Sequence, residues 1–353
     1  MERVPLADGT AIEGIDHEKV SSWLAASISE AKPPFAFELI AGGRSNLTYR
    51  VTGADGRTFA LRRPPVSHVL PTAHDMKREY TVISALGHTE VPVPRAFGLC
   101  ADVSVNGAPF FVMSFVNGHI LRSEEAATVL SEAGRMRASH SLVDTLAQLH
   151  AVDVDAVGLG EFARREGYIE RQLKRWHSQF TQSNVEGVTG PAVIDRVHDL
   201  LASRIPDQQA VSIVHGDYRL DNTVLDDNGM VQAILDWEIS TLGDPLADLG
   251  LLLVYWAEPG DDDPTLIGVT PTAAPGFARR SELISRYATA SGLDVSQISY
   301  YRAFGYWKLA CILQGVHARY AGGAAAGDRS GVDQFASHVG RLGERALTEV
   351  ESL

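Results

Sequence analysis

Three polar residues of one short stretch have the chemistry that phosphate transfer needs. They are two carboxylates, Asp217 and Asp236, and the carboxamide of Asn222. Asp217 is a candidate base for a substrate hydroxyl, and the other two offer hard oxygen ligands of the kind that Mg²⁺ accepts. Phosphoryl transfer requires such a base and such metal ligands, with little covalent work by the protein. The stretch therefore predicts that reaction type.

Strand-like segments bracket these residues. Apolar, β-type runs occupy 211–214, 223–225 and 231–235, and Asp226–Gly229 is a turn sequence between the last two. Asp217 and Asn222 are therefore expected on a loop and Asp236 at a strand end, where a rigid scaffold commonly presents functional groups. The alternative is that each polar residue only caps a turn, as Asp and Asn often do.

The pattern H-G-D-x-x-x-x-N at 215–222, followed by I-L-D-W at 234–237, resembles the aminoglycoside phosphotransferase or choline kinase-like family. That family is related to the protein kinases, whose H-R-D-x-x-x-x-N and D-F-G motifs correspond. The resemblance implies a catalytic Asp217, Mg²⁺ ligands Asn222 and Asp236, and a structural support in His215.

A second motif follows the first. Gly243-Asp244-Pro245-Leu246-Ala247-Asp248-Leu249 also matches the family. The resemblance implies that Asp248 buttresses the catalytic loop from the start of a helix.

A glycine-containing loop lies upstream, between predicted strands at 35–39 and 47–52. Glycine lets a backbone approach phosphates closely, so the loop could cover a nucleotide with its N–H groups. An ordinary hairpin turn is the alternative. The candidate loop residues are Gly42, Gly43, Arg44, Ser45 and Asn46.

The next strand, 58–62, ends in Phe59-Ala60-Leu61-Arg62, at the place of the kinase V-A-I-K. The family commonly has Lys there, and Arg is not equivalent to it, although Arg62 can still clamp α- and β-phosphates. The sequence Leu61-Arg62-Arg63-Pro64-Pro65 is similar to that of the kinase-like domains fused to acyl-CoA dehydrogenases. Arg63 is expected on the opposite face of the strand.

A helix is predicted from a capping-box pattern at 72–75 to Leu86. Glu79 on this helix matches the kinase glutamate that pairs with the strand cation, so an Arg62–Glu79 ion pair is expected. A solvent-exposed glutamate is the alternative.

The run 110–118 resembles the family's hinge, and its apolar character also fits a plain core strand. Adenine would bond backbone groups and stack on apolar side chains there. The residues expected to contact it are Met113, Ser114, Phe115 and Val116.

The order of elements predicts an α+β protein with a protein-kinase-like, two-lobe fold. A β-rich nucleotide-binding lobe is expected at 1–115, and a mainly helical lobe with the catalytic loop and acceptor site at 116–353. The 353 residues have a formal net charge of −13, which argues against nucleic-acid or membrane partners. Two cysteines and the absence of a long apolar run fit a reduced, cytoplasmic setting. The protein is expected to be a monomer or a homodimer.

The combined expectation is an ATP- or GTP-dependent, Mg²⁺-requiring transfer of the γ-phosphoryl group to a hydroxyl of a small molecule. The acceptor stays open between an aminoglycoside, a choline-like alcohol and a hydroxyacyl thioester or other metabolite. The acidic loop Glu258–Pro264 could hold a cationic acceptor or be a solvated surface loop. Two other hypotheses are a catalytically silent nucleotide-binding protein and a metal-dependent hydrolase that uses His215, Asp217 and Asp236.

Overall fold

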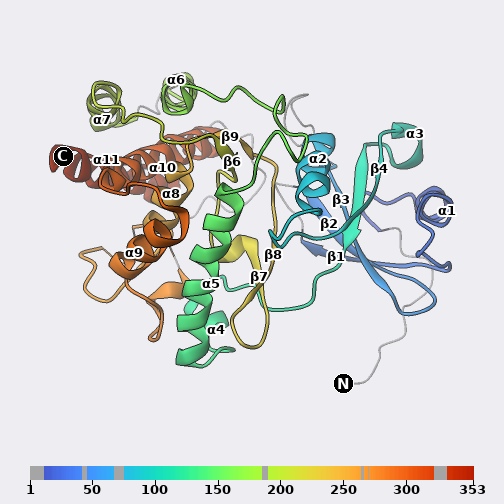
Figure 1. Ribbon diagram of the computed structural model, residues 1–353. Helices are drawn as coiled ribbons and strands as arrows, with labels where there is room; N and C mark the ends of the chain where they lie inside the picture. The colour runs from blue at the N-terminus through green and yellow to red at the C-terminus, as the bar shows by residue number, and fades with distance from the viewer. Residues whose placement is uncertain are drawn as a thin grey trace. The chain divides into compact units, whose positions relative to one another are not determined.

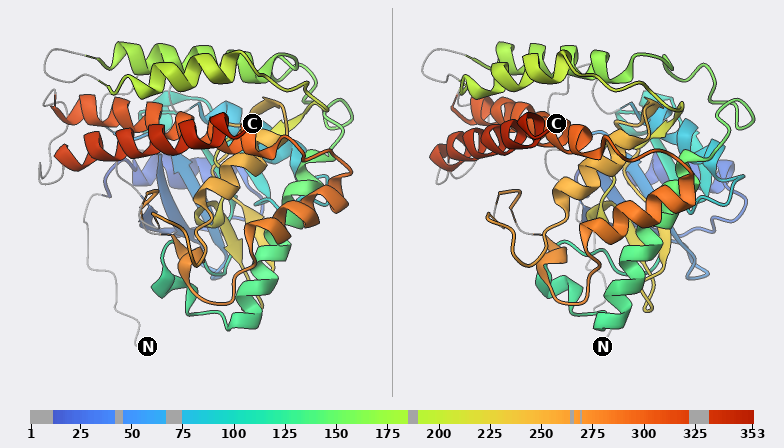
Figure 2. Two further views of the ribbon diagram at one scale, coloured as in Figure 1. Left: turned by 90° about the vertical axis from the view of Figure 1, so that its left-hand side faces the viewer. Right: turned by 60° about the vertical axis from the view of Figure 1, so that its left-hand side comes forward.

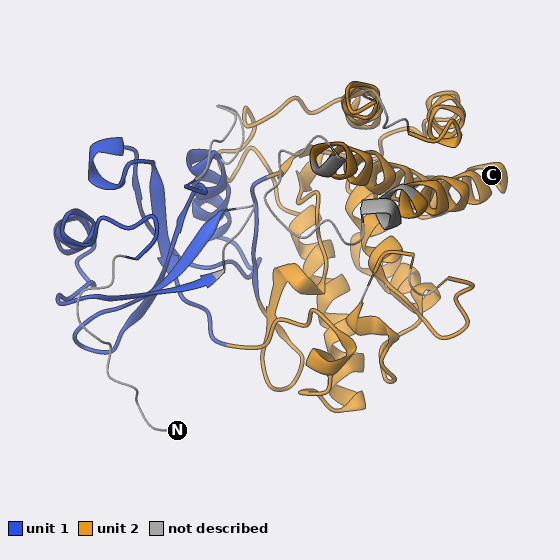
Figure 3. Cartoon of the chain, turned by 180° about the vertical axis from the view of Figure 1, so that it is seen from behind, with its two compact units in different colours: residues 1–117, 233–238 blue, residues 118–232, 239–353 orange. Residues whose placement is uncertain are grey.

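The computed structural model divides the chain into two compact units (Figure 3). Unit 1 comprises residues 1–117 and 233–238, and unit 2 comprises 118–232 and 239–353. The structure describes residues 12–41, 46–66, 75–184, 190–263, 266–268, 270–321 and 332–353. The functional division into a nucleotide lobe and an acceptor lobe stays a prediction.

Unit 1 is built on a five-stranded antiparallel sheet with the order β1-β2-β3-β5-β4 (Figure 1). The β3–β5 register pairs Arg62 with Phe111 and Phe59 with Ser114. The elements of unit 1 are α1 (His17–Ser27), β1 (Ala36–Ala41), β2 (Leu47–Thr52), β3 (Thr58–Arg63), α2 (Met76–Leu86), β4 (Ala96–Cys100), α3 (Val103–Asn106) and β5 (Phe110–Ser114).

The two faces of this sheet have different coverings. Successive side chains of each strand point to opposite faces of the sheet. The side chains on one face, which include Tyr49, Phe59 and Phe110, form a hydrophobic core with Val20 and Leu24 of α1. Helix α2 packs against β4 and β5 on the opposite face of the sheet. Arg62 follows Leu61 in β3, so its side chain points to the face of the sheet that α2 covers.

The predicted capping box at 72–75 did not locate the start of α2. The helix begins at Met76, and the carboxylate of Asp75 accepts hydrogen bonds from the backbone N–H groups of Lys77 and Arg78. Residues 72–74 of the pattern lie outside the described residues, and Asp75 is the N-cap of the helix. An N-cap Asp satisfies the otherwise unpaired N–H groups of the first turn.

Unit 2 is mainly helical. Its long helix α10 packs against α6, α7, α8 and α11, and α5 packs against α9 (Figure 2). The helices of unit 2 are α4 (Glu124–Ala127), α5 (Glu132–His150), α6 (Tyr168–Gln182), α7 (Val193–Ala202), α8 (Leu246–Tyr255), α9 (Arg280–Ser291), α10 (Ile298–Ala321) and α11 (Val332–Glu351), with the 3₁₀ turns η1 (Leu220–Asn222) and η2 (Pro271–Ala273).

Short strands flank the loop that carries Asp217. The three predicted runs are β6 (Ser212–Val214), β7 (Thr223–Leu225) and β8 (Val231–Ile234), and β6 pairs with β9 (Thr241–Gly243). The strand β9 and the helices α4 and α7 were not predicted. None of the helices in the described ranges combines the length and apolar composition that crossing a bilayer requires.

Candidate active site

Asp217 lies on the loop between β6 and η1, and Asn222 closes that 3₁₀ turn. The Asn222 Nδ2 donates to the Asp217 backbone oxygen at 2.8 Å and to Asp217 Oδ2 at 2.9 Å. Both partner atoms are acceptors, so the carboxamide must present its nitrogen to them. The Asn222 Oδ1, the atom that a metal ion would use, therefore faces away from Asp217.

The backbone of the loop that carries Asp217 is held by Asp248 in the first turn of α8. Its Oδ2 accepts from the His215 N–H at 2.6 Å and its Oδ1 from the Gly216 N–H at 2.8 Å. Asp248 is buried, yet its pKa is lowered, because hydrogen bonding and charge from His150, with the Gly216 N–H, outweigh the raising effect of burial. The predicted buttress is therefore present as a charged carboxylate.

His150 is the last residue of α5. It is buried, and its ring bonds the hydroxyl of Tyr287 through Nδ1 at 2.7 Å and Asp248 Oδ2 through Nε2 at 3.4 Å. The contact to Asp248 spans 98 positions of the chain, so no local pattern could have indicated it.

Gly216 must be glycine at this point of the loop. Its φ is +86°, a conformation that other residues seldom adopt. A Cβ there would also lie 3.1 Å from side-chain carbons of Ile239. With Gly216 in this conformation between them, the Asp217 N–H donates to His215 Nδ1 at 3.2 Å.

Two residues beside Asp217 were not predicted. The Arg219 Nε lies 3.5 Å from Asp217 Oδ1, and its guanidinium stacks over the Tyr255 ring at 4.5 Å from the centroid. The Tyr255 hydroxyl is hydrogen-bonded to Asp217, and burial together with that carboxylate raises the pKa of Tyr255. Arg219 lies within the H-G-D-x-x-x-x-N motif, so its position next to Asp217 could have been predicted from the sequence. Tyr255 ends the apolar helix α8, and no pattern marks it.

Unit 1 has its own charge cluster around Arg62. The Arg62 Nε lies 3.1 Å from Glu79 Oε2, so the predicted ion pair is present, and its Nη2 donates to Asp236 Oδ1 at 2.5 Å. Both the Arg62 and Glu79 side chains are buried, at 10% and 1% exposure. Arg63 contacts the backbone oxygens of Gly14 and Asn106 instead, as expected for the opposite face of β3.

Burial and shared charge set the ionisation of this cluster. Burial raises the pKa of Glu79 to about 7, against the lowering effect of Arg62. Arg62 cannot compensate fully, because Asp236 and Glu238 share its positive charge and add their own repulsion to Glu79. Burial lowers the pKa of Arg62, but these three carboxylates raise it above its ordinary value.

Asp236 follows β8 with a φ of +64°, and it is the sole non-glycine residue with positive φ in the described ranges. Asp tolerates this conformation better than most residues, but it remains uncommon and marks functional sites. The carboxylate is 31% exposed while bonded to Arg62. A partly exposed carboxylate is a hard oxygen donor of the kind that fits Mg²⁺.

The predicted phosphate loop lies largely outside the described residues, which exclude Gly42, Gly43, Arg44 and Ser45. Its last member, Asn46, is buried, and its Nδ2 donates to Glu238 Oε2 at 3.1 Å. Within unit 1, this contact connects the end of the loop to the segment that carries Asp236.

The predicted hinge at 110–118 comprises β5 and the residues that follow it. Met113 is buried, and Phe115 lies under the Arg50 guanidinium at 4.1 Å. The Ser114 N–H is already used, because it donates to the Arg95 oxygen at 2.8 Å. An adenine bond to Ser114 would therefore use its carbonyl, with the Val116 backbone as the second group.

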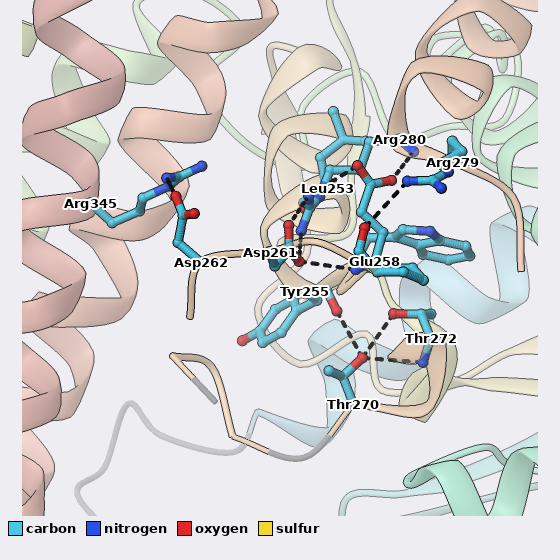
Figure 4. A network of polar contacts seen from close by, with 12 residues as sticks. Leu253, Tyr255, Glu258, Asp261, Asp262, Thr270, Thr272, Arg279, Arg280 and Arg345 are labelled. Carbon is cyan, nitrogen blue, oxygen red and sulfur yellow. Dashed lines mark hydrogen bonds and ion pairs between the residues drawn. The ribbon is translucent and has the colours of Figure 1, made fainter. Parts of the chain in front are cut away.

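In the acidic loop after α8, Glu258 and Asp261 are paired with an arginine, whereas the Asp262 side chain is 95% exposed. Arg280 binds both carboxylate oxygens of Asp261 at 2.6 Å, and the Arg280 N–H donates to Glu258 Oε2 at 2.9 Å (Figure 4). Hydrogen bonds from Arg280 and the Glu258 N–H outweigh burial and lower the pKa of Asp261. Asp262 lies 4.0 Å from Arg345. Arg280 therefore engages the carboxylates of Glu258 and Asp261.

An apolar pocket lies beside Arg219 and Tyr255. Its volume is about 330 Å³. The other residues around it are mostly aliphatic and come from the 266–268 segment, α10 and α11: Leu266, Ile267, Gly268, Leu309, Ile312, Leu313, His338 and Leu342. A pocket of this kind accommodates an apolar body next to the polar groups at Asp217.

The arrangement of the 215–222 loop, Asp248 and the Arg62–Glu79 pair can be compared with known proteins. Residues 36–283 match the model of the phosphotransferase enzyme family, and the chain belongs to that family. Its curated relatives include acyl-CoA dehydrogenase family member 11 of Rattus norvegicus, which is 35% identical over 86% of this chain and 39% of its own length. Family member 10 of Mus musculus is 34% identical over 80% of this chain and 26% of its own length. The chain thus spans well under half of these relatives.

Solved structures agree with this assignment. A Ralstonia eutropha protein, proposed to be an aminoglycoside phosphotransferase, is 31% identical with a TM-score of 0.79, covering 96% of this chain and 98% of its own. Choline kinase from Cryptosporidium parvum is 12% identical with a TM-score of 0.65, covering 96% of each chain, and shares the fold. The predicted α+β, protein-kinase-like fold is confirmed.

Proposed function

We propose that this protein transfers the γ-phosphoryl group of ATP or GTP to a hydroxyl of a small molecule. The observation that carries the proposal is the arrangement at Asp217. Its carboxylate is oriented by Asn222, and the loop on which it stands is held by the buried, charged Asp248. Orientation of a nucleophile and stabilisation of phosphate charge are the main contributions that a protein makes to phosphoryl transfer.

Asp217 accepts the proton of the acceptor hydroxyl, and the acceptor oxygen forms a bond to the γ-phosphorus. The bond from that phosphorus to the bridging oxygen breaks, and the nucleoside diphosphate leaves with the electron pair. Arg62 contacts the α- and β-phosphates while Glu79 holds its guanidinium. The 42–46 loop covers the phosphates, and Met113–Val116 contacts the base.

Asn222 and Asp236 are the proposed Mg²⁺ ligands, supported by the outward Oδ1 of the first and the partly exposed carboxylate of the second. Bound Mg²⁺ neutralises phosphate charge during transfer.

The acceptor that the pocket supports best has an apolar body and a hydroxyl, such as a hydroxyacyl thioester. The aliphatic lining beside Arg219 and Tyr255 suits such a body. A polycationic aminoglycoside is supported less, because Arg280 engages the carboxylates of Glu258 and Asp261. The relatives named as acyl-CoA dehydrogenases point in the same direction.

The test is release of ADP or GDP in the presence of Mg²⁺ and three acceptor panels: hydroxyacyl-CoAs, choline-like alcohols and aminoglycosides. Turnover is expected with the hydroxyacyl panel and should be lost in Asp217→Asn. The matched control is Asp227→Asn, which changes a carboxylate that is 94% exposed in the turn after β7. Preferred turnover of aminoglycosides would overturn the acceptor assignment, and turnover independent of Asp217 would overturn the role of this residue.

One observation favours a second candidate, a catalytically silent nucleotide-binding protein. Arg62 replaces the usual lysine and binds Asp236 directly, so an arginine occupies an oxygen proposed for Mg²⁺. A thermal-shift titration separates the two candidates. A silent protein would gain stability from Mg-ATP without any Asp217-dependent ADP release, whereas an active one shows both.

A further inference from the structure

Lys308 is a buried cation on α10 that the proposed reaction does not yet use. It is 6% exposed, and its Nζ donates to the backbone oxygen of Gly216 at 2.8 Å. Its ammonium also lies 5.7 Å from the centre of the Trp176 ring on α6. Burying an ammonium is costly unless its surroundings compensate, so its position beside the catalytic loop requires an explanation.

The contact acts on one peptide plane, that between Gly216 and Asp217. Lys308 holds the carbonyl end of this peptide. At the other end, the Asp217 N–H donates to His215 Nδ1 at 3.2 Å. A nitrogen that accepts this bond has a lone pair, so the neutral ring carries its proton on Nε2. The peptide from which the Asp217 side chain projects is therefore fixed at both ends.

The neighbouring peptide is fixed independently. Asp248 accepts the Gly216 N–H at 2.8 Å, so Gly216 is held by a carboxylate on its nitrogen and by an ammonium on its oxygen. Gly216 also has a positive φ, a conformation that glycine visits among several others. A single restraint on its N–H would leave the following peptide free to rotate, and the second restraint removes that freedom.

We infer that Lys308 is a positioning residue for phosphoryl transfer, which fixes the direction of the Asp217 carboxylate through the Gly216 carbonyl. The inference rests on the proposed function and adds a residue from a helix that follows the catalytic loop by some 90 positions. Misplacement of a catalytic group by about 1 Å can cost on the order of 100-fold in rate. Lys308 therefore acts on kcat and leaves nucleotide affinity unchanged.

The charged groups that face Lys308 come from three elements. They are Asp217 on the loop, Asp248 on α8 and Arg175 on α6. Burial lowers the pKa of Lys308, the two carboxylates oppose this, Arg175 adds to it, and the pKa stays below its ordinary value of 10.5. The pKa of the nearby Tyr255 is raised by burial, so that hydroxyl does not titrate in the same range.

The experiment measures Mg-ATP hydrolysis, with water as the acceptor, and Mg-ATP affinity in three variants. Lys308→Met keeps the length of the side chain and removes the donor. Lys308→Arg keeps a donor and a charge that does not titrate. Lys174→Met is the matched control, because Lys174 is exposed on α6.

Lys308→Met is expected to lower kcat by about 10- to 100-fold with Mg-ATP affinity within about twofold of wild type. Lys174→Met should behave as wild type. Lys308→Arg should retain the wild-type activity within about tenfold. At alkaline pH the wild type should lose activity as Lys308 deprotonates, whereas Lys308→Arg should keep its activity.

An unchanged kcat in folded Lys308→Met would overturn the role of Lys308, as would equal losses of kcat and nucleotide affinity. If Lys308→Met does not fold, Lys308→Arg decides: an alkaline loss identical to that of the wild type overturns the inference. Absence of any Asp217-dependent ADP release in the wild type is a different result, because it removes the proposed function and this inference with it.

Discussion

Asp217 in unit 2 stands on a loop whose backbone is fixed by buried side chains, whereas Asp236 in unit 1 is held by the side chain of one arginine. Asp248 and Lys308 bind the N–H and C=O groups around Gly216. Arg62 instead divides its charge between Glu79 and Asp236. The first arrangement restrains a backbone, and the second balances the charges of side chains against one another.

The difference suits the two roles that we propose. A base that must meet a hydroxyl at a defined angle benefits from a fixed peptide. A cluster that must accept phosphates and Mg²⁺ benefits from ion pairs that incoming charges can reorganise. Removing a restraint from unit 2 should therefore affect stability and turnover together, while changes in unit 1 should affect nucleotide binding and its pH dependence.

The largest effect is expected from Asp248→Ala. This change leaves the His215 and Gly216 N–H groups buried without their acceptor, which should lower the free energy of unfolding by about 2–5 kcal/mol. Turnover should fall by about 100-fold or more because the loop is no longer fixed. Chemical denaturation and ADP release measure the two effects. A folded variant with unchanged turnover would show that the backbone restraint has no role in the reaction.

Asp236→Ala should affect nucleotide binding by unit 1. Loss of a proposed Mg²⁺ ligand is expected to weaken Mg-nucleotide binding by about 10- to 100-fold, measured by calorimetry. Stability should fall by only about 1 kcal/mol, because the Arg62–Glu79 pair remains while Ala tolerates the positive φ at this position less well than Asp. Asp55→Ala, in the exposed turn between β2 and β3, is the control. Equal affinities for Mg-nucleotide in the two variants would remove Asp236 from the site.

The smallest expected effect concerns the pH dependence of unit 1. The pKa of Glu79 is raised from 4.5 to about 7 in the folded protein, so the folded state binds more protons than the unfolded chain between these values. The free energy of unfolding should therefore fall as the pH rises from about 4.5 to about 7. In Glu79→Gln this contribution should disappear. Denaturation at a series of pH values tests it, and an equal slope in both proteins would contradict it.

Much of the site was predictable because its residues are neighbours in the sequence. The motif at 215–222, the buttress Asp248 and the Arg62–Glu79 pair were all found at the expected positions, since each depends on a local pattern or on the kinase-like order of elements. The strands β2 and β7 were predicted with their correct bounds, because apolar β-type runs end there at clear turn signals.

The remaining features depend on contacts between distant parts of the chain. Lys308 and His150 reach the catalytic loop and Asp248 from helices that are remote in sequence, and nothing in their own segments marks them. The acidic loop at 258–263 was interpreted from its charge alone, whereas its partner Arg280 follows about 20 residues later. The assignment of residues 233–238 to unit 1 likewise required the three-dimensional structure.

The central claim is that Asp217 directs phosphoryl transfer and has no part in holding the nucleotide. The most direct measurement compares wild type and Asp217→Asn in two assays, the rate of ADP release and the affinity for Mg-ATP. Asn nearly keeps the size of the side chain and removes the base, so release should fall by about 100- to 10,000-fold with affinity within about twofold. Release at the wild-type rate in the folded Asp217→Asn variant would contradict the account.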